Sequence, residues 1–270
     1  AGDTDKLMKQ IDEAKAQGAD ITLDIYPYPS GSTIAVSYLP SDVQEGGPDN
    51  IIRSLSNPSK RKKIVDYLES EQYYSRSINE LIFSNLTKNR HLEGISLPEV
   101  AKKRGVSVGN ALCDILLEED LEVGHSAPPP VSYRLWRQIS QDCMKLLARE
   151  DYMVCSDITP AGGIPHPRTY GAFPRFLGRL RRNFGGISIE EMVHRMTERP
   201  ARRFGLTQRG RIAKGYFADI TIFDADRIID TSTYEDPKQY PVGIPYVLVN
   251  GEIAVDREQC TGVLAGQAIP

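Results

Sequence analysis

The feature that most constrains this chain is a short apolar run that ends in a carboxylate. Residues 152–156 read Tyr-Met-Val-Cys-Ser, and Asp157 follows directly. Arg168 comes eleven residues later, after a turn rich in glycine and proline. In α/β barrels, functional side chains lie on the loops that follow the carboxyl ends of the strands. The spacing therefore predicts a strand that carries Asp157 to the mouth of such a barrel, with a cation nearby.

Position alone leaves several roles open for these two side chains. A carboxylate at a strand end can bind a metal, act as a general base, or cap the following turn. A guanidinium in a loop suits the recognition of a carboxylate, or it can be an ordinary surface arginine. Tyr26 and Ser32 follow another predicted strand and could donate hydrogen bonds to the same anion. Tyr26 could equally be a core aromatic with a satisfied hydroxyl.

The first part of the chain has the rhythm of a βαβ unit. Residues 4–17 have the periodicity of an amphipathic helix, and residues 21–26 alternate as a strand. The prolines that follow this strand predict a loop at its carboxyl end. The region from about 29 to 95 breaks the rhythm, with a basic helix at 58–70 and a short strand at 80–85. We expect this region to be an insertion that forms a lid.

The remaining sequence predicts more helices and then a change of texture. Helices are expected at 96–103, 107–118 and 131–149, the first opened by the capping box Ser96–Glu99. From about residue 208 the pattern becomes that of strands, with a hairpin at 247–255 turned by Asn-Gly. The sequence therefore predicts an α/β domain over residues 1–207 and a small β-domain over 208–270.

Composition excludes several classes of function. The 270 residues are 40% hydrophobic and 26% charged, with a net charge of −3, which does not favour nucleic acid or an anionic membrane as a partner. The four cysteines form no Cys-x-x-Cys pair, so we expect reduced thiols and a cytoplasmic protein. The four histidines form no His-x-His or His-Glu-x-x-His motif. The residues thus offer one good carboxylate and one good cation, without a complete catalytic set.

Five stretches carry a resemblance to a known family. They read DIYPYPSGST, NRHLEGISLPEVAKKRG, CSDITPAGGIPHPRTYGAFPRFLG, RGRIAKGYFADITIFD and TYEDPKQYPVGIPYVLVNG. Together they resemble the N-acyl-D-amino-acid deacylases, or D-aminoacylases, of the amidohydrolase superfamily. The loop from Asp157 to Arg168 and the YEDP…VNG segment are the specific parts. The strand around residues 218–224 is shared by many amidohydrolases.

The resemblance implies a zinc-dependent TIM-type barrel with a small β-sandwich domain, which hydrolyses N-acyl-D-amino acids to a D-amino acid and a carboxylate. Asp157 matches the family's catalytic Asp, which is also a metal ligand and moves a proton from water to the leaving amine. Arg168 matches the arginine that holds the substrate carboxylate, and Tyr26 and Ser32 match its two helpers.

The sequence departs from the family in its metal ligands. The family's His-x-His, bridging Cys and later single histidines would all lie before Ala1, and no cysteine or histidine of this chain stands in an equivalent position. We therefore expect the C-terminal part of such an enzyme, with zinc in the complete enzyme and none held by this chain. We also expect it to be inactive alone, and to pair with an N-terminal half chain or with itself.

Two other functions remain open. One is a hydantoinase- or dihydroorotase-like amidohydrolase, and the other is a non-catalytic domain kept for binding or assembly. The clamp formed by Tyr26, Ser32 and Arg168 favours a substrate with a free α-carboxylate. Linear N-acyl amino acids carry that group, and a simple hydantoin lacks it.

Overall fold

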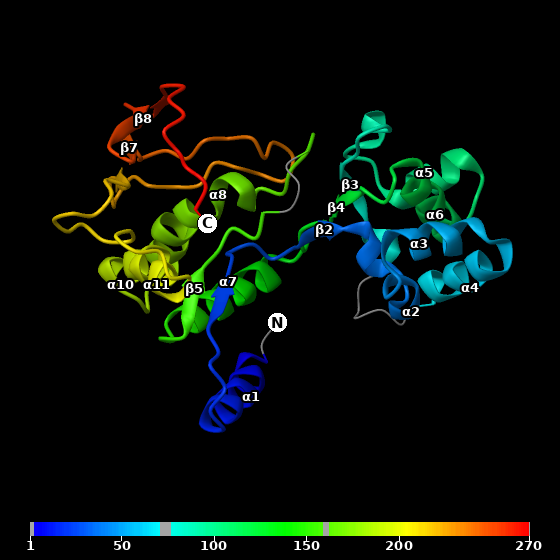
Figure 1. Cartoon of the computed structure of the whole chain (residues 1–270), viewed down its shortest axis with the longest axis horizontal. Coiled ribbons are helices and arrows are strands. Elements are labelled where there is room, and N and C mark those ends of the chain that lie inside the picture. The colour runs from blue at the N-terminus through cyan, green and yellow to red at the C-terminus, as the bar shows by residue number, and fades with distance from the viewer. Residues whose placement is uncertain (1–2, 71–76, 159–161, 270) are drawn as a thin grey trace.

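The computed structural model describes residues 3–70, 77–158 and 162–269. Parts of two predicted features lie outside the described residues, namely 71–76 of the insertion and 159–161 of the loop after Asp157, together with the end residues 1–2 and 270 of the two predicted domains. Figure 1 shows helices α2 to α6 gathered around strands β2 to β4 on one side of the molecule. The other side holds strand β5, helices α7, α8, α10 and α11, and the C-terminal strands.

Two parallel strands underlie the part that carries Asp157. Strand β1 (Leu23–Ile25) pairs in parallel with β5 (Tyr152–Val154). Helix α1 (Thr4–Ala16) leads into β1, and helix α7 (Tyr133–Leu147) leads into β5. Parallel strands require a crossover connection between them. The predicted helices at 4–17 and 131–149 and both predicted strands are confirmed, and each strand is shorter than its apolar run.

Helices close over this strand pair and give it an apolar core. The core contains Leu147, Tyr152, Val154, Phe176 and Met192, all buried. Their side chains come from α7, from β5, from a π-helical turn (Phe176–Leu180) and from α10 (Ile189–Met196). The turn continues α8 (Arg168–Arg175) into α9 (Arg181–Phe184). This packing holds the end of β5 in place, and therefore also the start of the loop that carries Asp157.

The helices and strands between residues 32 and 126 form a helical unit around a small antiparallel sheet. The sheet has the order β2-β4-β3, with β2 at Ser32–Ile34, β4 at Gly124–Ser126 and β3 at Ile82–Asn85. Its helices are α2 (Ser41–Gln44), α3 (Gly47–Ser56), α4 (Pro58–Glu69), α5 (Leu97–Arg104) and α6 (Val108–Glu118), with 3-10 turns at Ala35–Tyr38, Ile78–Glu80 and Arg90–Leu92.

The core of this unit extends past the predicted limit at residue 95. One apolar cluster takes in residues from Ala35 to Val123, including buried side chains of α5 and α6 such as Val100 and Leu112. The reason is packing, because α6 lies against α4 and α5 lies against α6. The predicted capping box at Ser96–Glu99 is present at the start of α5.

The C-terminal residues form the expected strands. Helix α11 (Glu198–Arg203) precedes an antiparallel sheet in the order β6-β7-β8-β9, formed by Ile220–Ile222, Tyr246–Val249, Glu252–Asp256 and Gln259–Cys260. Asn250 (φ 50°) and Gly251 (φ 88°) both have positive φ, as a tight hairpin turn requires. Within the described ranges, no helix has the length and apolar content needed to cross a membrane.

Asp151, just before β5, ties the strand to α1 and to the turn that follows α7. Its carboxylate lies 2.9 Å from Lys15 Nζ of α1 and 3.0 Å from Arg149 Nη2. Burial alone would raise the pKa of Asp151, but the hydrogen bonds from Arg149 and Lys15 outweigh it and lower the pKa to about 2. Because the pKa is lower in the folded state, the ionised carboxylate stabilises the fold fully at pH values above its unfolded-state pKa. This stabilisation is lost as the pH falls from there through about 2.

Replacing Asp151 with asparagine is therefore expected to lower the free energy of unfolding by about 2 kcal/mol at pH 7. At pH 3 the difference should shrink to roughly half, because part of the stabilisation is already lost in the native protein. Urea denaturation at both pH values measures it. An equal difference at pH 7 and pH 3 would contradict the role given to the ionised carboxylate.

Candidate active site around Arg168

Arg168 lies at the centre of the candidate site, and all four predicted site residues meet there. It is the first residue of α8, and its side chain is only 1% exposed. Its Nη1 lies 2.9 Å from Asp157 Oδ2, and its Nη2 donates to the backbone carbonyl of Ser32 at 2.8 Å. The guanidinium carbon lies 4.4 Å from the centre of the Tyr26 ring. Ser32 and Tyr26, which precede Arg168 by 136 and 142 positions in the sequence, thus converge on its guanidinium.

Asp157 lies three residues beyond the end of β5, as the strand-end argument predicts. Its side chain is 54% exposed, in contrast with the buried arginine that it contacts. Its φ is 47°, in the left-handed region that few residues other than glycine, asparagine and aspartate adopt. Strained backbone of this kind is often retained at functional positions.

Tyr26 and Ser32 reach the site by different routes. Tyr26 follows β1 directly, and because β1 and β5 are parallel, the residues after both strands lie at the same edge. Ser32 was expected in a loop, but it begins β2, and its hydroxyl donates to the His125 carbonyl at 2.8 Å. Its backbone carbonyl accepts the hydrogen bond from Arg168. The three-residue strand is too short to show a periodicity in the sequence.

The guanidinium of Arg168 is incompletely satisfied. Among the described residues, neither Nε nor Nη1 has a hydrogen-bond acceptor, and both are buried. The contact with Asp157 is an ion pair that lacks the alignment of a hydrogen bond. Leaving a buried donor without an acceptor costs about 1–3 kcal/mol for a neutral group, and more for a charged group such as this one. The arrangement therefore leaves donor capacity for an anion.

His166 supports the start of α8. It is 3% exposed, and its Nδ1 accepts the backbone N–H of Arg168 at 3.1 Å. Its Nε2 lies 3.2 Å from Ser30 Oγ. Burial, and after it the charge of Arg168, lowers the pKa of His166 to about 3. The imidazole is therefore neutral, which leaves Nδ1 able to accept a hydrogen bond.

A second buried cluster lies at the other end of α8. Arg175 Nη1 is 2.8 Å from Asp230 Oδ2, and Arg179 Nε is 2.9 Å from Asp230 Oδ1. Tyr28 donates to the same carboxylate at 3.4 Å, and burial is the main cause of its raised pKa. In contrast with Arg168, Arg175 is well satisfied, because its Nε also donates to the Pro27 carbonyl at 3.0 Å. Sequence reasoning missed this cluster.

The described residues do not by themselves form a metal centre. In the ranges 3–70, 77–158 and 162–269, no three His, Cys, Asp or Glu side chains are grouped so that they could hold a metal ion. Asp157 can supply one carboxylate ligand, whereas a zinc site needs three or four ligands. The residues present therefore do not fit a zinc site without further ligands.

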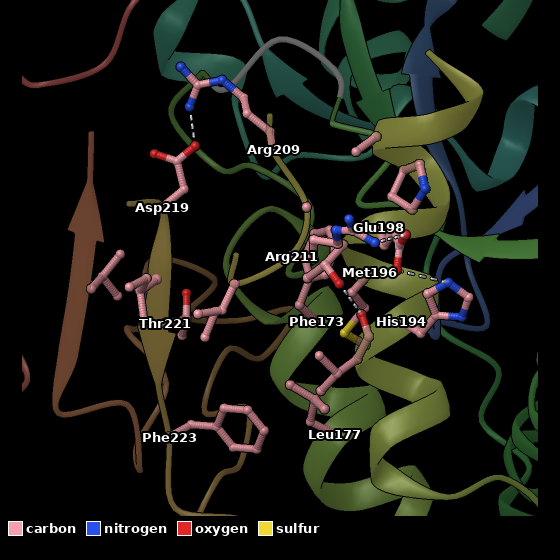
Figure 2. Close-up of a pocket in the computed structure, with 18 of the residues that line it drawn as sticks. Phe173, Leu177, His194, Met196, Glu198, Arg209, Arg211, Asp219, Thr221 and Phe223 are labelled. Atoms are coloured by element: carbon pink, nitrogen blue, oxygen red, sulfur yellow. Dashed lines mark hydrogen bonds and ion pairs between the residues drawn. The ribbon is translucent and has the colours of Figure 1, made fainter. Parts of the chain in front are cut away.

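A pocket of about 860 Å³ lies elsewhere, between helices α8, α10 and α11 and the strands β6 and β7. Figure 2 shows its largely apolar lining, with Phe173 and Leu177 on one side and Phe223 on the other. Two pairs of charged side chains line it, Arg209 with Asp219 and Arg211 with Glu198. None of the four predicted site residues lines it.

Comparisons with known proteins agree on one group of enzymes. N-acyl-D-glutamate deacylase of Alcaligenes xylosoxydans xylosoxydans is 32% identical over 253 residues, which cover 93% of this chain and 41% of that protein. D-aminoacylase of the same organism is 35% identical over 178 residues, 66% of this chain and 34% of that protein. The chain thus spans less than half the length of the curated relatives it matches.

Solved structures give the same picture. A D-aminoacylase structure described for its binuclear metal centre superposes with a TM-score of 0.69 at 28% identity, covering 98% of this chain and 46% of that one. N-acyl-D-glutamate deacylase from Bordetella bronchiseptica, solved with zinc and a phosphonate mimic of the tetrahedral intermediate, gives 0.65 at 29% identity, covering 94% and 43%.

The sequence profile of the amidohydrolase family matches residues 118–255, which are 138 of the 270 residues. The matched region contains β5, Asp157, Arg168, and the segment with Asp230 and Tyr234. A match over more than half of the chain, with the likeness to D-aminoacylase structures, establishes that this protein belongs to the amidohydrolase family.

Proposed function

We propose that this chain supplies the catalytic carboxylate and the substrate-carboxylate clamp of an N-acyl-D-amino-acid deacylase. The reaction is hydrolysis of the amide bond of an N-acyl-D-amino acid to a D-amino acid and a carboxylate. The proposal draws on the names of the relatives, and on the gathering of Asp157, Arg168, Tyr26 and Ser32 at one place.

The observation that carries the proposal is the buried, incompletely satisfied guanidinium of Arg168. An N-acyl amino acid offers a free α-carboxylate, and a guanidinium is the side chain best suited to bind one. A simple hydantoin offers no such group, so the clamp favours a linear substrate. Tyr26 stacks on one face of the guanidinium and limits the directions from which an anion can approach.

Asp157 is assigned the proton transfers. Its exposed carboxylate takes a proton from the water that attacks the amide carbonyl, and returns it to the amine nitrogen as the C–N bond breaks. We expect zinc in the complete enzyme, because the Bordetella relative was solved with zinc. Since the described residues offer Asp157 as a single ligand, the other ligands would come from outside them.

The same proposal covers the architecture. We assign β1 and β5 to a TIM-type barrel over residues 1–207, the helical unit predicted at about 29 to 95 and continuing through α6 to a lid, and residues 208–270 to part of a small β-sandwich. Among the described residues β1 and β5 pair only with each other, so their outer edges are open, which favours an N-terminal half chain or a second copy as a partner. The four cysteines, including the exposed Cys260, are free thiols, which favours the cytoplasm.

A substrate panel tests this function. The chain is assayed with zinc, alone and mixed with the part of N-acyl-D-glutamate deacylase that it does not match. The panel contains N-acetyl-D-leucine, N-acetyl-D-glutamate, N-acetyl-D-aspartate, N-acetyl-L-leucine and hydantoin. We expect turnover of N-acetyl-D-amino acids in the mixture and none by the chain alone. Preference for hydantoin would favour the cyclic-amide alternative, and absence of both binding and turnover in every sample would favour a non-catalytic role.

A further inference from the structure

Tyr234, from the YEDP segment, lies directly behind the candidate site although it is 66 positions beyond Arg168. Its hydroxyl accepts a hydrogen bond from Ser30 Oγ at 2.9 Å. Its ring meets the His166 ring edge to face, with centroids 5.2 Å apart, and packs in the same way against Tyr28 and Trp136. Tyr234 therefore contacts His166, the group that supports Arg168.

The hydrogen bonds between these residues have a single consistent direction. The backbone N–H of Arg168 donates to His166 Nδ1, so Nδ1 carries no proton and the neutral ring carries its proton on Nε2. That Nε2–H then donates to Ser30 Oγ, 3.2 Å away. Ser30, having accepted, donates its own hydroxyl proton to Tyr234 Oη. The three bonds form a chain that begins at Arg168 and ends at Tyr234.

The acceptor at Tyr234 supports this direction from the other end of the chain. Without an acceptor at Tyr234, the Ser30 hydroxyl can rotate and donate to His166 Nε2 instead. The imidazole would then move its proton to Nδ1, where two N–H groups would face each other across the bond to Arg168. Because the chain is buried, with Ser30 8% and His166 3% exposed, water cannot readily replace the missing acceptor.

We propose that Tyr234 is a positioning residue, which holds His166 in the Nε2–H form through Ser30 and thereby fixes the backbone origin of the Arg168 side chain. The contacts of Tyr234 with Ser30 and His166 join the C-terminal segment to the loop after β1 and to the start of α8. The C-terminal segment therefore takes part in positioning the Arg168 clamp. The use of the clamp for a substrate carboxylate rests on the proposed function.

The test compares the full chain with its Tyr234→Phe variant, which keeps the ring and removes the acceptor. Nitrogen-15 NMR reports the tautomer of His166, and amide hydrogen exchange reports the bond from the Arg168 N–H. We expect a single Nε2–H form in the native protein. In the variant we expect a detectable Nδ1–H form, exchange at Arg168 about tenfold faster, and binding of N-acetyl-D-leucine weakened about fivefold to tenfold.

Two further variants separate positioning from general packing. Ser30→Ala interrupts the same chain, so the double variant with Tyr234→Phe should be no worse than the more affected single variant. Tyr133→Phe removes a hydroxyl from a side chain that is 77% exposed and should change none of the readouts. Fully additive effects of the two substitutions would contradict a shared chain of hydrogen bonds.

The outcomes distinguish this inference from the proposed function. An unchanged His166 tautomer and unchanged Arg168 exchange in Tyr234→Phe overturn the inference, whatever the ligand does. Changed NMR readouts with unchanged ligand affinity also overturn it, because the chain would then exist without setting the clamp. If the native chain has no affinity for N-acetyl-D-amino acids, the proposed function fails, and the NMR readouts alone decide whether Tyr234 positions Arg168.

Discussion

Replacing Arg168 with methionine is expected to weaken binding of N-acetyl-D-amino acids roughly a hundredfold while leaving the fold intact. Truncating one partner of a buried charge pair costs about 2–5 kcal/mol of binding energy. In the free protein the same change removes a buried charge with two unmet donors, so its stability cost is small. The Ser32 carbonyl loses one hydrogen bond, and Asp157 is exposed enough to be hydrated. We expect the free energy of unfolding to change by no more than about 1 kcal/mol.

Arg175→Met is the matched control for this prediction. Arg175 belongs to the same helix and is also buried, but it is paired with Asp230 and bonded to the Pro27 carbonyl. Breaking a buried pair on one side costs about 3–5 kcal/mol of stability, and somewhat less here because Arg179 remains beside Asp230. Ligand titration and urea denaturation of both variants measure the contrast. Equal destabilisation by both changes would show that Arg168 is a structural arginine.

Replacing Asp157 with asparagine is expected to abolish turnover and spare binding. Loss of a general base lowers kcat by about 10²–10⁴-fold, and the amide cannot accept the proton. Asparagine tolerates the positive φ of this position, and the side chain is exposed, so the fold should be unaffected. Because the variant also removes an anion from beside Arg168, the affinity for a carboxylate ligand should stay the same or rise.

Two quantities are measured for each variant: kcat in the zinc-containing mixture with the unmatched part of N-acyl-D-glutamate deacylase, and the dissociation constant of N-acetyl-D-leucine. Asp20→Asn serves as a control, since Asp20 precedes β1, at the opposite end of that strand from Tyr26, and forms an exposed ion pair with Arg203. A near-native kcat in Asp157→Asn would show that Asp157 does not transfer the proton in the reaction. Weakened binding with unchanged kcat would instead assign it to the ligand-binding surface.

The position of Asp157 could be predicted from the sequence because the rule behind it is local. An apolar run ending in a polar loop predicts a strand end, and the end of β5 lies three residues before Asp157. The hairpin at Asn250–Gly251 is equally local, since both residues need positive φ. The association of Tyr26 with Asp157 follows from the parallel pairing of β1 and β5, which the alternating helix and strand pattern predicts.

Features that depend on distant contacts could not be predicted in this way. Ser30 and Tyr234 are 204 positions apart, and no periodicity indicates that their hydroxyls meet. The YEDP segment signalled the family, without indicating what its tyrosine contacts. The extent of the helical unit past residue 95 could not be predicted, because helices of similar sequence pattern can share one core or belong to two. Only their packing shows that α5 and α6 share the core of this unit. The role of the Ser32 carbonyl was hidden because a backbone group has no sequence signature.

The account depends most on Arg168 as the residue that recognises a substrate carboxylate. The direct measurement is a four-way comparison, in which the native chain and Arg168→Met are each titrated with N-acetyl-D-leucine and with its C-terminal amide. We predict that the native chain prefers the carboxylate roughly a hundredfold, and that the variant binds both ligands equally weakly. The same preference in both proteins, or no preference in the native chain, would contradict the proposed clamp.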